Sequence, residues 1–387
     1  EAAAQTWALP LHLKYSDGNS TQTKTLLLKE ESKSISLGEN VKWVMPDAGT
    51  YGYYRWNIPA EMLLLLAEQP QGALSEREQV AFLGNATALL DAGVISGDTY
   101  LSILSGFARS PEPDIVASVA SKLLKIRDAF IPDDLRDAFA FYIRTTFRPA
   151  LNRVGLEKKD GEPAVVSALR PQLIGWLGDE GNDREIREFA KTKAREILAN
   201  PAATDPSMAG VILRIAALEG DETLFQTYKS NFETAKSPVL RGLFLGALGA
   251  FSDSKLQDAA LAYILEGPLH PNELFTIPRR IADTAEGRDR NFNWLLKNYD
   301  AITSRLPAEY AAFMPFSARG CSAERLEKAR EFFSNPAHQV PGTMNTLQKV
   351  SESVMDCVNL RQREGTAVAA YLIKLADKQE NDTQGSE

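Results

Sequence analysis

The chain has 387 residues, of which 44% are hydrophobic and 24% are charged. These fractions are typical of globular proteins and argue against a disordered chain, and the length predicts two or three domains or one extended repeat array. The formal net charge of −8 argues against a nucleic-acid partner, because contacts to phosphates require a basic surface.

The first 58 residues have the character of β-strands. Leu9–Leu13, Thr23–Leu28 and Val41–Val44 contain β-branched, aromatic or alternating apolar residues. Turn-forming residues separate them, as at Asp17–Asn19, where the side chains tolerate positive φ. Residues 1–58 are therefore predicted to form a small antiparallel β domain. His12 alternates with leucines in the first strand and is expected at a surface or sheet edge, with metal binding as the alternative.

From Pro59 onward the apolar period changes to about three and a half residues, which indicates amphipathic helices. Stripes of this kind run over residues 116–130, 208–218 and 240–248. Ser75 and Glu78 form a predicted capping box at one helix start. Glycines such as Gly93 and Gly267 stand where helices should stop.

The helical part is predicted to be a repeat structure. We count about fifteen helices between residues 59 and 376, and one helical hairpin then occupies roughly 40 residues, as in stacked repeats. The expected fold is mainly α: an irregular HEAT/armadillo-like α-solenoid, a superhelix of antiparallel helix pairs, preceded by the β domain. Residues 377–387 are acidic and polar and are predicted to be a flexible tail.

Three motifs near the start resemble a known enzyme family. They are Trp7–Leu11, Lys42–Val44 and Gly52–Asn57, and they resemble W-x-(I/V/L)-P-L, W-(V/I/L) and G-Y-Y-R-V-x-Y in the β-sandwich domain of aminopeptidases. The family includes aminopeptidase N, puromycin-sensitive aminopeptidase and the endoplasmic-reticulum aminopeptidases. Trp56 stands where Val is usual in the third motif. Leu74–Gly93 is similar to the first helix of the family's C-terminal domain.

This resemblance implies a β-sandwich domain at residues 1–58 and a helical domain at residues 59–376. Within the third motif, alternation predicts a final strand with Tyr53 and Arg55 on one side and Trp56 on the other. The family's enzymes are zinc peptidases that release N-terminal residues. The helical domain would then enclose the active-site chamber and contact the peptide substrate.

The zinc-binding motif of such peptidases is not present in the sequence. Their H-E-x-x-H motif places two histidines on one helix face, with a downstream Glu as the third ligand. Here the only histidines are His12, His270 and His338, and none belongs to such a motif. The zinc is therefore expected in a catalytic domain outside these residues, and this chain alone is expected to be inactive. Phosphate-binding and serine-hydrolase motifs are also missing.

Four arginines are candidate substrate-binding residues. Arg279, Arg280, Arg288 and Arg290 surround Gly287 at a predicted helix–loop–helix junction. The resemblance implies that the concave face of the helical domain can meet the far end of a peptide, where paired N–H donors could bind a carboxylate. The alternative is a solvated loop with ordinary salt bridges.

Cys321 and Cys357 are the only cysteines and lie 36 residues apart, close to the length of one helical hairpin. They can form a disulfide between adjacent helices or remain two buried thiols. Exported bacterial members of the family look similar at these positions, which favours the disulfide. The resemblance thereby implies an oxidising compartment, either periplasmic or secreted, although a cytoplasmic location stays open.

Two functions remain open from the sequence. The first is the non-catalytic C-terminal region of a zinc aminopeptidase, and the second is an autonomous helical-repeat module that binds a peptide or protein and has no enzymatic parent. The first residue is not Met and no signal features follow it, so we expect an excised piece or a chain that has lost a signal. The longest apolar runs, Met62–Ala67 and Leu243–Phe251, fall far short of the roughly 20 residues of a membrane span.

Overall fold

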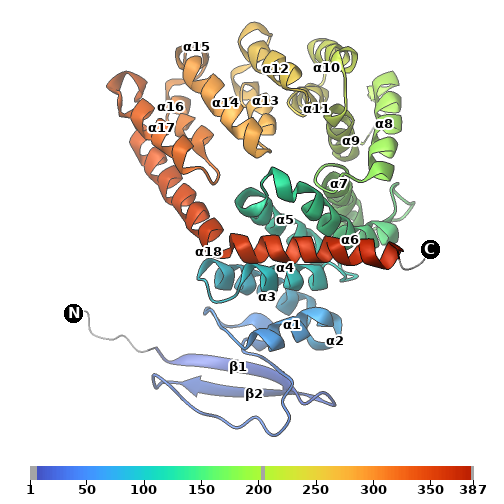
Figure 1. Ribbon diagram of the computed structural model, residues 1–387, viewed down its shortest axis with the longest axis vertical. Helices are drawn as coiled ribbons and strands as arrows, with labels where there is room; N and C mark the ends of the chain where they lie inside the picture. Colours follow the sequence, from blue (N-terminus) through green and yellow to red (C-terminus); the bar gives the residue numbers. More distant parts are fainter. Residues whose placement is uncertain (1–6, 202–204, 385–387) are drawn as a thin grey trace.

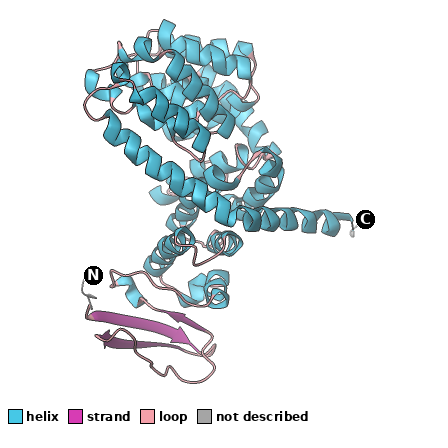
Figure 2. Ribbon diagram, turned by 60° about the vertical axis from the view of Figure 1, so that its left-hand side comes forward, coloured by secondary structure: helices cyan, strands magenta, loops and turns pink. Residues whose placement is uncertain are grey.

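The computed structural model describes residues 7–201 and 205–384. A small β-sheet occupies one end of the molecule and helices form the rest (Figures 1 and 2). This arrangement confirms the prediction of a mainly α fold preceded by a small β unit. None of the helices in the described ranges is long and apolar enough to cross a membrane.

The sheet contains three antiparallel strands in the order β2-β1-β3. They are β1 (Leu9–Ser16), β2 (Thr21–Leu28) and β3 (Trp43–Met45). The tight turn between β1 and β2 is held by Asp17, whose Oδ1 accepts from the amides of Asn19 at 2.8 Å and Ser20 at 2.9 Å. Within the described residues this is a single sheet, whereas a sandwich requires two packed sheets.

Residues 51–58 form no strand and pair with none of the strands of the sheet, so the predicted final strand is wrong. The expected alternation is present: Tyr53 is fully exposed, while Trp56 keeps 9% of its surface. A side chain replaces the missing strand neighbour. Asn85 Oδ1 accepts from the Trp56 amide at 3.2 Å, and Asn85 Nδ2 donates to the Trp56 carbonyl at 2.8 Å.

The helices follow one another with short links, and the capping box predicted at Ser75 and Glu78 is confirmed at the start of α3. Their bounds are α1 (Ala60–Glu68), α2 (Pro70–Ala73), α3 (Glu76–Asp91), α4 (Gly97–Phe107), α5 (Pro113–Phe130), α6 (Arg136–Val154), α7 (Ala164–Gly178), α8 (Arg184–Ala199), α9 (Pro206–Leu218), α10 (Glu222–Thr234), α11 (Pro238–Leu248), α12 (Ser254–Glu266), α13 (Thr276–Ile281), α14 (Ala285–Lys297), α15 (Tyr299–Thr303), α16 (Ala308–Ala311), α17 (Ala323–Ser334) and α18 (Thr343–Gln384).

From α5 to α13 the helices stack in two layers, as expected of a solenoid. The odd-numbered helices α5, α7, α9, α11 and α13 pack one on the next and form a continuous inner row. Each of α6, α8, α10 and α12 packs on a neighbouring helix of that row and lies outside it (Figure 1). A continuous cluster of buried apolar side chains extends from Trp43 in β3 to Leu372 in α18.

The last helix, α18, connects α17 with helices α4, α5 and α6. Its beginning packs on α17 and its end on α4, α5 and α6, and it changes direction between them (Figures 1 and 2). Arg361 Nη2 donates to the Asp128 carbonyl at the end of α5, at 3.1 Å. Glu364 Oε2 accepts from the Gly97 amide at the start of α4, at 3.0 Å.

Helix α18 continues beyond the end predicted for the helical domain. It extends to Gln384, so helix occupies most of the segment that was expected to be a flexible tail. Residues 385–387 of that segment lie outside the described residues. Cys321 and Cys357 form a disulfide with Cα atoms 5.2 Å apart, which joins the segment before α17 to α18.

Candidate functional site

The four arginines expected to bind a carboxylate lie on α13 and α14, but they do not meet at one point. Arg279 is exposed, and its side chain has no polar partner in the part of the chain that the structure describes. Arg280 pairs with Asp283 in the turn before α14, at 2.7 Å. Arg290 pairs with Asp258 of α12, at 2.7 Å. The exposed ion pair of Arg290 is an ordinary salt bridge, which was the alternative to substrate binding. A carboxylate site shared by all four arginines stays a prediction.

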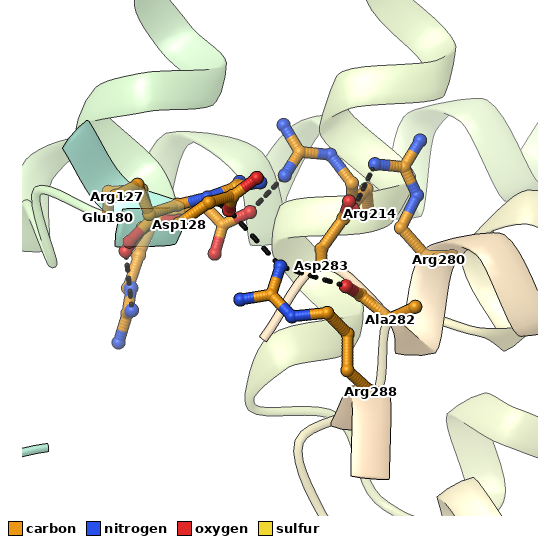
Figure 3. A network of polar contacts seen from close by, with 10 residues as sticks. Arg127, Asp128, Glu180, Arg214, Arg280, Ala282, Asp283 and Arg288 are labelled. Atoms are coloured by element: carbon orange, nitrogen blue, oxygen red, sulfur yellow. Dashed lines mark hydrogen bonds and ion pairs between the residues drawn. The ribbon is translucent and has the colours of Figure 1, made fainter. Parts of the chain in front are cut away.

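Arg288 differs from the other three because it contacts a distant part of the chain. Its Nη1 lies 3.2 Å from Oδ1 of Asp128 at the end of α5, and only 12% of its side chain is exposed. Arg127 also binds Asp128, at 3.0 Å, and reaches Glu180 in the turn between α7 and α8, at 3.3 Å. These contacts connect α14, α5 and the α7–α8 turn (Figure 3).

Two acidic residues follow one another in the α7–α8 turn. Asp179 forms an ion pair with Arg214 of α9, and Glu180 forms the pair with Arg127. Burial and the adjacent Asp179 carboxylate raise the pKa of Glu180 to about 7, while Arg127 and Arg214 act in the opposite direction. The pKa of Glu180 therefore lies close to neutrality.

A cavity of about 360 Å³ opens beside this network. It lies on the inner row of helices and is lined by Pro171, Gln172, Gly210, Val211, Arg214, Gly242, Leu243, Gly246, Ala247 and Arg280. Two glycines of α11 provide much of the space, because a Cβ at Gly242 or Gly246 would meet no other atom within 4 Å. Arg214 and Arg280 are the only charged residues of the lining.

The cavity is suited to an anionic group. A guanidinium offers several N–H donors in a plane and matches a carboxylate in shape and charge. Arg214 and Arg280 already pair with Asp179 and Asp283, so an incoming carboxylate would share or replace these partners. Apart from Gln172 and Arg214, the wall residues from α7, α9 and α11 are apolar or small, which leaves room for the aliphatic part of a ligand.

The sequence interpretation identified Arg280 but missed Arg214. A signal was available, because Arg214 is the only charged residue of α9, whose 13 residues are otherwise apolar, small or uncharged. Gly175 of α7 makes room for it, since a Cβ at that position would lie 2.8 Å from Arg214 Nη2. A lone arginine in an apolar helix, opposite a glycine, is therefore the pattern to look for.

The histidines of the described ranges do not belong to a zinc site. His12 Nδ1 lies 3.1 Å from the Thr25 hydroxyl on the neighbouring strand. His338 stacks on Phe332 with ring centroids 3.8 Å apart. No group of three His, Cys, Asp or Glu side chains placed to hold a metal exists in the described ranges.

Comparison with known proteins identifies the family. Residues 43–356 match the family described as ERAP1-like C-terminal domain. The chain belongs to this family. The match begins in β3 and ends in α18, so it includes the inner helices, the cavity and both sides of the charged network. The predicted resemblance to the C-terminal region of aminopeptidases is thereby confirmed.

Curated relatives include aminopeptidases of yeast and rice. The chain is 21% identical to the alanine/arginine aminopeptidase of Saccharomyces cerevisiae, and the alignment covers 90% of this chain and 41% of that protein. It is 21% identical to aminopeptidase 2, mitochondrial, of the same yeast, with 90% and 37% covered. For aminopeptidase M1-C of Oryza sativa subsp. japonica the identity is 24%, with 96% and 44% covered. The chain thus spans less than half the length of these relatives.

Proposed function

We propose that this chain is the non-catalytic C-terminal region of a zinc-dependent aminopeptidase, which encloses the active-site chamber and contacts the peptide substrate. Membership of the ERAP1-like C-terminal domain family and the names of the relatives support the enzyme class. The autonomous binding module has less support, because each of the three relatives described is named an aminopeptidase.

The observation that carries the substrate contact is the cavity between Arg214 and Arg280. It lies on the inner row of helices, which would surround a chamber, and its two cations lie on different helices, α9 and α13. A peptide that enters the chamber presents its free carboxylate or an acidic side chain at some distance from its N-terminus. We propose that this anionic group occupies the cavity, so that the helical domain holds the far end of the peptide.

The zinc and the compartment also belong to this proposal. Since the described residues do not fit a metal site, zinc would be held by a catalytic domain outside this chain, where it would activate a water molecule for hydrolysis. The disulfide is the only support for an oxidising, periplasmic or secreted location. The relatives do not support export, and one of them is named as mitochondrial.

Peptide binding to the chain itself tests the proposal. We would measure fluorescence anisotropy with a labelled nonapeptide that carries a free C-terminal carboxylate, and with the same peptide as its C-terminal amide. The acid is expected to bind at least about tenfold more tightly, because an ion pair in a partly buried site is worth about 1.5 kcal/mol or more. Equal affinities of the acid and the amide would overturn the proposed contact.

A filled cavity provides the matched variant. Gly246→Leu places a side chain in open space inside the cavity and should abolish binding without unfolding the helix. The control is Gly84→Leu in α3, because a Cβ at Gly84 also meets no atom within 4 Å but lies outside the cavity. Undiminished binding by the Gly246 variant would show that the peptide binds elsewhere.

A further inference from the structure

The edge of the cavity carries charges of both signs. Four arginines and four carboxylates form ion pairs there: Arg127, Arg214, Arg280 and Arg288 with Asp128, Asp179, Glu180 and Asp283. Arg361 adds a fifth cation, since it lies near Arg288 and donates to the Asp128 carbonyl. An additional anion between Arg214 and Arg280 adds negative charge beside the adjacent carboxylates Asp179 and Glu180. In a partly buried site this repulsion is costly, and uptake of a proton by one of the two carboxylates relieves it.

Glu180 is the group best placed to take up that proton. It lies in the turn after α7, next to Asp179, which is the ion-pair partner of the cavity residue Arg214. The charged groups that face the turn come from several elements: Arg127 and Asp128 of α5, Arg144 and Arg148 of α6, Arg187 of α8, Arg214 of α9, and Arg280, Asp283 and Arg288 around α13 and α14. Arg148 pairs with Asp183 at the end of the turn.

Two of these arginines bind backbone rather than carboxylate oxygens in the turn. Arg144 Nη1 donates to the Gly181 carbonyl at 2.6 Å, and Arg187 Nε donates to the Gly178 carbonyl at 2.8 Å. Arg187 is also paired with Glu219 at 2.8 Å. Neither arginine therefore neutralises Glu180 directly, and Arg127 is its only ion-pair partner among the described side chains.

We propose that an anionic group bound between Arg214 and Arg280 draws one proton onto Glu180, so that the affinity of the cavity for anions rises as the solution becomes more acidic. This inference rests on the proposed function, because it assumes that the cavity binds an anion. The proton comes from solvent and joins a Glu180 carboxylate oxygen. No bond within the protein or the ligand is broken.

The electrostatic reason is competition for Arg214. An incoming carboxylate attracts this guanidinium and weakens its hold on Asp179, so the Asp179 charge acts more strongly on Glu180. In the absence of ligand, burial and Asp179 already raise the pKa of Glu180 to about 7. Any further rise in the bound state therefore falls in the range between neutral and mildly alkaline pH.

The linkage between proton binding and ligand binding determines whether the affinity rises or falls with pH, and over which pH range. When a bound ligand raises the pKa of a group, the affinity increases as pH falls through the bound-state pKa and becomes constant below the free-state pKa. A rise of one pKa unit corresponds to a tenfold gain in affinity. We therefore expect about tenfold tighter binding at pH 6.5 than at pH 9, with little change below pH 6.5.

Isothermal titration calorimetry tests the inference directly. The probe is an N-acetylated nonapeptide with a free C-terminal carboxylate, because acetylation removes the amino group that would titrate in the same range. Titrations at pH 7.5 in two buffers of different ionisation enthalpy give the number of protons taken up. Uptake of a substantial fraction of one proton is expected, and binding without uptake would overturn the inference.

Variants assign the proton to its residue. Glu180→Gln should bind the probe with no proton uptake and with an affinity that is independent of pH. Glu185→Gln is the control, because Glu185 is an exposed carboxylate on the adjacent helix that pairs with Arg148 away from the cavity. Retained uptake in the Glu180 variant would overturn the inference, and equal binding of acid and amide peptides would instead overturn the proposed function.

Discussion

Replacing Glu180 by Gln is expected to remove a pH dependence of stability that the α7–α8 turn confers. In the folded chain, burial and the adjacent Asp179 raise the pKa of Glu180 from 4.5 to about 7. In the unfolded chain the carboxyl group returns to its ordinary pKa. Between these two values the folded state binds a proton that the unfolded state does not, so folding is favoured by acid.

The size of the effect follows from the shift. At about 1.4 kcal/mol per pKa unit, the rise to about 7 corresponds to about 3 kcal/mol. Since 24% of the Glu180 side chain remains exposed, we expect solvent to reduce this to about 2 kcal/mol. The contribution is fully present below pH 4.5, declines as the pH rises, and is lost above pH 7.

Urea unfolding at pH 5 and pH 8, followed by tryptophan fluorescence, measures this contribution. Trp176 of α7 lies close in sequence to the turn and should report on it. The Gln variant should be about 2 kcal/mol more stable than the parent at pH 8 and nearly equal to it at pH 5. Glu185→Gln should show no such difference. An equal difference in the free energy of unfolding between the parent and the Glu180 variant at both pH values would contradict this expectation.

Three further substitutions test the scaffold around the site. Replacing both Cys321 and Cys357 by Ser should lower the free energy of unfolding by about 3 to 4 kcal/mol, because the disulfide closes a loop of 36 residues. An unchanged urea midpoint after reduction of the disulfide in the parent protein would contradict this expectation. Asn85→Ala leaves two peptide groups of Trp56 without partners and should cost about 2 to 3 kcal/mol, and hydrogen exchange at the Trp56 amide should become faster. Ser75→Ala removes the cap of α3 and should cost about 1 kcal/mol in the same unfolding assay, whereas no change would show that Glu78 alone suffices.

Features that depend on neighbouring residues could be predicted from the sequence. The capping box at Ser75 and Glu78 needs only four residues, and it forms as expected. The stripe at residues 208–218 became α9, and the stripe at 240–248 became most of α11. In each case the physical cause lies within one helix, so the spacing of side chains along the chain is sufficient.

The segment after β3, which pairs with no strand, shows what the spacing of side chains cannot predict. Alternation correctly predicted that Tyr53 would be exposed and Trp56 buried. Alternation sets only the direction of side chains, whereas a strand also needs a neighbour that accepts and donates its backbone hydrogen bonds. At Trp56 the partner is the side chain of Asn85, which lies 29 residues away. No local pattern indicates such a contact.

The candidate site could not be predicted from the sequence, for a related reason. Arg288 and Arg290 are neighbours in sequence, but residues two apart on a helix point to different sides. Arg288 therefore reaches Asp128 on α5, while Arg290 reaches Asp258 on α12. A cluster of arginines in the sequence thus became two separate sets of contacts. The cavity instead combines Arg280 with Arg214, which is 66 residues away and follows from the stacking of α9, α11 and α13.

Internal pairing of the cavity arginines has a consequence for how tightly the site can hold a ligand. An anion has to share Arg214 and Arg280 with Asp179 and Asp283 or replace these partners, so only the difference between similar ion pairs contributes to binding. We therefore expect modest affinity and rapid release, unlike the tight capture by an arginine that has no partner. Protonation of Glu180 removes a negative charge near the bound anion, so acid should slow dissociation of the probe. Exchange of partners in this way is consistent with the proposed function, in which the helical domain holds and releases successive peptides.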